Sequence, residues 1–100
     1  MFNRIIIAAA ALMLTAPLAM AGPIDNACIR SDRAQGNAPL CGCIQQVADQ
    51  TLSRSDQRRA AKFFHDPHQA QEAQTSNSNS DSAFWSRYTN FADTAAAYCS

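Results

Sequence analysis

The stretch SAFWSRYTNFADTAAAY, residues 82–98, has the clearest periodic pattern in the chain. Its apolar side chains recur every three or four residues, so an α-helix would gather them on one face. Together with the cysteine that follows, this stripe consists of Phe84, Tyr88, Phe91, Ala92, Ala95, Tyr98 and Cys99. The pattern predicts a C-terminal helix over residues 82–98, with the stripe in the core and with Asp81 or Ser82 as its N-cap.

Three shorter helices are predicted upstream of this stretch. Residues 40–52 place their apolar side chains on one helical face, and residues 56–64 do the same with Ser55 as a suitable N-cap. Asp66 is a good N-cap and the proline after it suits the first helical position. A further helix is therefore expected from Pro67 to Gln74.

The remaining segments lack a sustained period. Residues 75–82 are a polar low-complexity run and predict a loop, and residues 22–39 contain turn formers and predict an irregular N-terminal arm. Glycine is scarce, while alanine and glutamine, both helix formers, are common. The sequence therefore predicts an all-α fold, in which three or four short helices surround one small core within residues 40–100.

The N-terminus has the features of a secretory signal peptide. A short segment with one positive charge precedes an apolar run over residues 5–15, and Ala19 and Ala21 supply small residues before a cleavage site. The run is shorter than the roughly 20 apolar residues that span a bilayer, which favours cleavage over an uncleaved anchor. We expect residues 1–21 to be removed after Ala21, leaving a soluble, monomeric periplasmic or secreted chain that does not associate with the membrane.

Four cysteines, Cys28, Cys41, Cys43 and Cys99, remain after that cleavage. In an exported chain an even number of cysteines indicates a disulfide framework, which a domain this small needs for stability. Cys41 and Cys43 would project about 200° apart from one helix, so a bridge between them is disfavoured. We expect one of them to bond to Cys28 and the other to Cys99, and the sequence leaves both assignments open.

Only weak candidates for a functional site are present. Arg58, Arg59 and Lys62 form a basic face that could contact an acidic partner or a phosphate, although such a face is also typical of the solvated side of a helix. Trp85 lies off the centre of the C-terminal stripe and could contact a partner or ligand. The pair Cys41 and Cys43 could alternatively exchange disulfides, but a structural role is favoured.

Several classes of function are disfavoured by composition and motifs. The formal net charge is zero, which gives no electrostatic reason to expect nucleic-acid binding. His65 and His68 flank a predicted helix start without a clear third ligand, and no catalytic motif is present. We therefore expect no catalytic residue, no metal site and no cofactor.

Three motifs resemble a family of short exported alphaproteobacterial proteins that is often catalogued as "arginine transporter". They are CGCIQQVAD at residues 41–49, FFHDPHQAQ at residues 63–71 and FWSRY at residues 84–88. The resemblance implies at most a soluble accessory to amino-acid transport, because a transporter needs several spanning helices. It carries over no catalytic or binding residue.

The functional hypothesis is a non-enzymatic periplasmic protein that binds another protein or a small ligand, or that has a structural role. The alternatives are the accessory role in arginine transport and disulfide exchange at the Cys-Gly-Cys motif.

Overall fold

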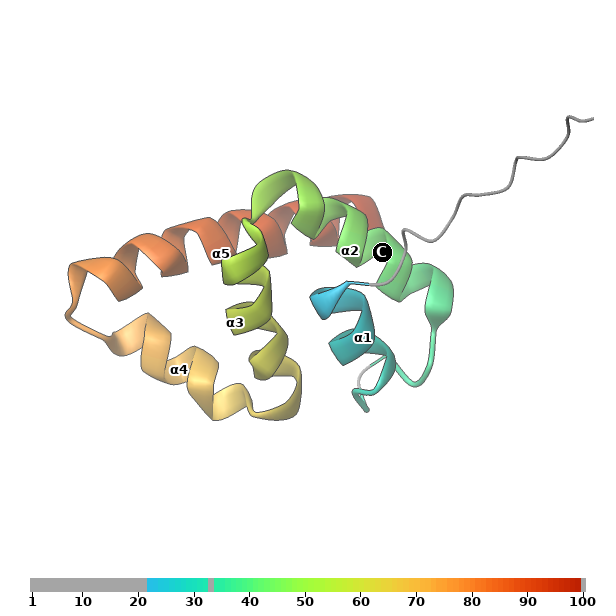
Figure 1. Ribbon diagram of the computed structural model, residues 1–100, viewed down its shortest axis with the longest axis horizontal. Coiled ribbons are helices and arrows are strands. Elements are labelled where there is room, and N and C mark those ends of the chain that lie inside the picture. The colour runs from blue at the N-terminus through green and yellow to red at the C-terminus, as the bar shows by residue number, and fades with distance from the viewer. Residues whose placement is uncertain (1–21, 33, 100) are drawn as a thin grey trace, which may run out of the picture.

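The computed structural model describes residues 22–32 and 34–99, which form five α-helices and no strand (Figure 1). The predicted all-helical class is confirmed, and the predicted signal peptide at residues 1–21 lies outside the described residues. The helices are α1 (Pro23–Ile29), α2 (Ala38–Thr51), α3 (Arg54–His65), α4 (Pro67–Thr75) and α5 (Asn79–Cys99). None of these helices is long and apolar enough to cross a bilayer.

The longest helix, α5, packs against α2, α3 and α4. Its C-terminal part lies along α2, and its N-terminal part faces α4, which returns from the end of α3 (Figure 1). The shortest helix, α1, packs against both α2 and α3. All five helices contribute side chains to the core. The N-terminal end of α2 lies beside the C-terminal end of α5, at the opposite end of α5 from the α4–α5 turn (Figure 1).

Aromatic side chains form the centre of the core, as the periodic stripe predicted. Phe84 and Phe91 are 1% and 4% exposed, and Ala95 is also buried. Phe63 from α3 meets Phe84 edge to face with ring centroids 6.0 Å apart, and meets Tyr88 at 5.1 Å. Edge-to-face pairs each contribute about 0.5–1.5 kcal/mol beyond their area burial, so this cluster fixes α3 against α5.

Side-chain caps set where the helices begin. Asp66 accepts a hydrogen bond from the backbone N–H of His68, and α4 starts at Pro67 as predicted. Helix α3 starts two residues earlier than predicted, because Ser53 rather than Ser55 accepts the capping hydrogen bond from Asp56.

The final helix also begins earlier than predicted. Ser78 Oγ accepts the backbone N–H of Asp81, and α5 starts at Asn79 rather than at Ser82. The polar loop expected over residues 75–82 is therefore confined to residues 76–78 between α4 and α5. Ser78 is one of several equivalent serines in this run, so composition alone could not indicate which of them caps the helix.

The N-terminal arm contains a helix where an irregular segment was expected. Helix α1 occupies residues 23–29 and buries Ile24, Ala27 and Cys28. Seven residues are too few to be stable as an isolated helix, so tertiary packing must hold this one in place. Its N-cap, Gly22, has no side chain, and Gln45 Oε1 from α2 accepts the Asp25 N–H at 2.8 Å instead.

Gln45 belongs to a buried network of two glutamines. Its side-chain nitrogen donates to Gln57 Oε1 and to Asp49 Oδ1, both at 2.8 Å. Gln57 Nε2 in turn reaches the backbone carbonyls of Ala48 and Leu52 at the end of α2. Gln45 and Gln57 are each 3% exposed, so these contacts join α1, α2 and α3 within the interior.

Two disulfides complete the framework. Cys28 bonds to Cys41, which ties α1 to α2, and Cys43 bonds to Cys99, which ties α2 to the last turn of α5. The expectation that Cys41 and Cys43 take different partners is confirmed, and the structure determines the pairing that the sequence left open. No cysteine among the described residues is free.

Candidate functional site

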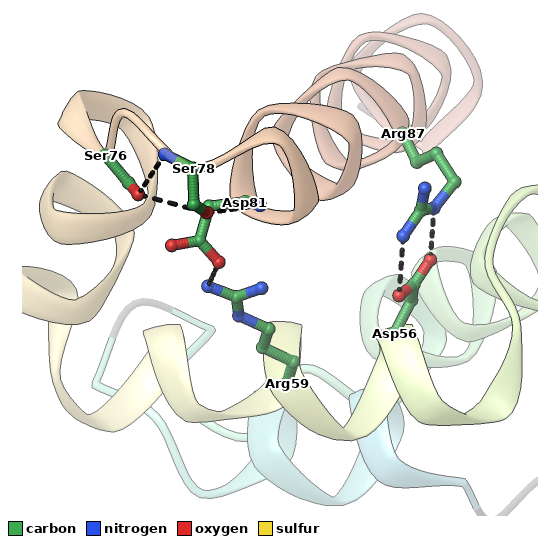
Figure 2. A network of polar contacts seen from close by, with 6 residues as sticks. All are labelled: Asp56, Arg59, Ser76, Ser78, Asp81 and Arg87. Atoms are coloured by element: carbon green, nitrogen blue, oxygen red, sulfur yellow. Dashed lines mark hydrogen bonds and ion pairs between the residues drawn. The ribbon is translucent and has the colours of Figure 1, made fainter.

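One cation of the predicted basic face on α3, Arg59, forms an ion pair with α5, whereas the other two do not. Arg58 and Lys62 are exposed and make no ion pair with a described residue. Arg59 instead reaches Asp81 on α5, with its guanidinium nitrogen 2.8 Å from Oδ1 (Figure 2). The same guanidinium lies 4.3 Å from the centroid of the Phe84 ring. Arg59 therefore serves the packing of α3 on α5, and only the other two predicted cations remain open to a partner.

A second ion pair joins the same two helices, but here the arginine is on α5 and the aspartate is on α3. Arg87 of α5 donates to Asp56 of α3 through Nε at 2.6 Å and through a terminal nitrogen at 3.2 Å (Figure 2). This hydrogen bond raises the pKa of Arg87, whereas the Ser76 hydroxyl and the Arg59 guanidinium lower the pKa of Asp81. The two pairs set the register of α3 against α5, which is a structural role.

Trp85 is half-buried rather than fully exposed. Its ring centroid lies 5.1 Å from that of Tyr88, and both rings pack against the hydrophobic core. Part of the indole remains accessible, but its position is fixed by the core. The structure does not bring Trp85 together with Arg58 and Lys62 in any hollow that it describes.

Tyr98 is the residue that sequence reasoning placed wrongly. The periodic stripe predicted it in the core, yet it is 78% exposed, and it is the one exposed large hydrophobic side chain in residues 22–32 and 34–99. Tyr98 lies in the last turn of α5, where Cys99 bonds to Cys43 and so occupies the place between the helices. The tyrosine is left at the outer edge of the stripe.

Two shallow hollows flank Tyr98 where α2 and α5 meet. We refer to them as the first and second hollows, and Cys43 and Tyr98 line both. The first is completed by Asn37, Pro39, Leu40 and Cys99. The second is completed by Gln46, Val47, Gln50 and Thr94. Neither hollow is lined by a charged side chain, so the surface combines apolar side chains with neutral hydrogen-bonding groups.

The histidines offer no metal site. His65 and His68 are both exposed, and His68 lies 3.4 Å from Glu72 one helical turn away. In the part of the chain that the structure describes, no three histidine, cysteine, aspartate or glutamate side chains are grouped so that they could hold a metal ion.

Comparisons with family models, curated proteins and solved structures found no match to the chain. The surface around Tyr98 must therefore be interpreted from its own chemistry.

Proposed function

We propose that the chain is an exported, non-enzymatic binding protein that presents the surface around Tyr98 to another protein. The observation that carries this proposal is the 78% exposure of a large aromatic side chain between two hollows. Tyrosine supplies a large contact area with few rotatable bonds and is enriched among residues that dominate binding energy. The Cys43–Cys99 bridge holds its helical turn against α2, so little conformational entropy is lost on binding.

The chemistry of the hollows favours a protein over a free amino acid. Arginine carries a guanidinium, an ammonium and a carboxylate, and a specific site would pair at least some of these charges. The residues lining both hollows are neutral. An accessory role in arginine transport would therefore need a different surface, and we expect no thermal shift of the purified protein at millimolar arginine.

The disulfide pairing also bears on exchange at the Cys-Gly-Cys motif. Cys41 and Cys43 bond to different partners, so an exchange pair made of these two would require both bridges to open first. Insulin reduction by the protein, compared with a Cys41→Ser variant that keeps the Cys43–Cys99 bridge, tests this alternative, and we expect the two proteins to have the same activity.

Export is the second part of the proposal. Disulfides persist in oxidising compartments, and two of them in so small a domain fit the periplasm or the extracellular medium. Gly22, which would follow the expected cleavage after Ala21, is the N-cap of α1 and is buried. The proposed cut therefore falls where the described residues begin, and it would leave the disulfide framework complete.

The binding surface is tested by photo-crosslinking in cells that export the protein. A benzophenone amino acid at position 98 should give a discrete adduct of higher mass, whereas the same probe at position 71, exposed on α4 and outside both hollows, should not. Adding Gln50→Arg, which places bulk and charge in the second hollow, should weaken the adduct from position 98. Equal crosslinking from both positions, or insensitivity to Gln50→Arg, would argue against this surface.

A further inference from the structure

The two disulfides differ in how far solvent reaches them. Cys28 and Cys41 are 1% and 0% exposed, so the bridge between them is enclosed by protein. Cys43 and Cys99 are half-buried, and both line the first hollow. Cys43 also lines the second hollow, so its side chain can be approached from two sides.

Access decides which disulfide a thiolate attacks in a folded protein. A bridge enclosed by the core reacts only in the small population of molecules whose fold has opened locally. We infer that Cys43–Cys99 is a thiol–disulfide exchange site that accepts an external thiolate, while Cys28–Cys41 is inert until the fold opens. This inference does not depend on the partner proposed above, because it needs only the burial of the four sulfurs.

The exchange proceeds in two balanced steps. The incoming thiolate forms a bond to Cys43 Sγ, because Cys43 lines both hollows whereas Cys99 lines only the first, and the Cys43–Cys99 bond breaks. Cys99 leaves with the electron pair of that bond and takes a proton from water. A second thiolate then attacks the sulfur of the first thiol in the mixed disulfide, and the two leave together as a disulfide. Cys43 departs with the electron pair of the broken bond and takes a proton from water, so the two external thiols supply the two electrons that reduce the bridge.

The consequence for the fold is confined first to the end of α5. Opening the bridge unties the last turn of α5 from α2, and the two residues shared by both hollows, Cys43 and Tyr98, lose their common anchor. The exchange site therefore acts on the helical turn that carries Tyr98. The bridge between α1 and α2 is not involved in this step.

The order of reduction tests the inference on the oxidised, purified protein. Samples incubated with reduced glutathione are quenched with acid, alkylated with N-ethylmaleimide and mapped by tandem mass spectrometry. We expect Cys43–Cys99 to open at least about tenfold faster than Cys28–Cys41, because only the latter waits for an opening of the fold. The first glutathione adduct should be on Cys43.

Two further arms sharpen the result. In concentrated guanidinium chloride the preference should disappear, because burial no longer protects Cys28–Cys41. Replacing glutathione by reduced thioredoxin distinguishes a small thiol from a protein dithiol as the more effective reagent, with the same bridge opening first in both. Equal rates for the two bridges in the native protein, an earlier opening of Cys28–Cys41, or a first adduct on Cys99 would overturn the inference.

Discussion

Replacing Gln45 by alanine should cost a large share of the stability of this domain. In the wild type, Gln45 accepts a hydrogen bond from the Asp25 N–H and donates one to Gln57 Oε1, each at 2.8 Å. The substitution leaves the Asp25 N–H without its acceptor and Gln57 Oε1 without its donor. Leaving a buried polar group unsatisfied costs about 1–3 kcal/mol. Asp25 is only half-buried and should cost about 1 kcal/mol, so the two groups together should cost roughly 2–4 kcal/mol. A domain of this size has a total stability of only about 4–12 kcal/mol.

The neighbouring glutamine provides a matched control. Gln46 is exposed and makes no hydrogen bond with a described side chain, so Gln46→Ala should change the free energy of unfolding by less than about 0.5 kcal/mol. Thermal unfolding followed by circular dichroism, with the disulfides intact, should place Gln45→Ala roughly 10–30 °C below the wild type. Melting temperatures within a few degrees of each other for the two variants would refute the role assigned to the buried network.

Three other paired comparisons follow from the same structure. A Cβ at Gly22 would lie 2.5 Å from the buried, hydrogen-bonded amide of Gln45, so Gly22→Ala should lower the free energy of unfolding by about 1–3 kcal/mol. A Cβ at Gly42 meets open space inside a helix, so Gly42→Ala should raise the free energy of unfolding by about 0.5–1 kcal/mol. Urea unfolding measures both changes, and changes of the same sign would contradict the packing described for Gly22. Arg59→Ala removes the contact of the guanidinium with the Phe84 ring and should lower the free energy of unfolding by about 1 kcal/mol, whereas Arg58→Ala should leave it almost unchanged. Similar urea midpoints for the two variants would count against that contact. The folded pKa of Asp81 lies below its ordinary value of 3.8, so the stability it contributes is present above that value and is lost as the pH falls through the lower folded pKa. The difference between the wild type and Asp81→Asn in urea unfolding should therefore shrink at acidic pH, and a constant difference would refute the assignment.

The helices of the C-terminal part could be predicted because their local signals agree with the tertiary structure. Asp66-Pro67 determines the start of α4 by itself, since capping and the fixed φ of proline are properties of neighbouring residues. The stripe containing Phe84 and Phe91 identified the core face of α5 for the same reason. The divergent projection of Cys41 and Cys43 from one helix also narrowed the disulfide pairing, since it depends only on helical geometry.

The remaining features depend on contacts between distant segments. Helix α1 is held by Gln45, which lies 20 residues further along the chain and appears in the sequence as an ordinary polar residue. Arg59 could not be distinguished from Arg58 without knowing which of them faces α5. Tyr98 continues the apolar stripe, and its exposure follows from the disulfide beside it, whose partner the sequence left open.

The expectation on which most of the others rest is that the chain is exported and carries two bridges, Cys28–Cys41 and Cys43–Cys99. Intact mass spectrometry of the protein taken from cells, alkylated without reduction, tests it most directly. We expect a chain that begins at Gly22 and carries no alkylated cysteine. A chain that still contains residues 1–21 and carries four alkylated cysteines would contradict it.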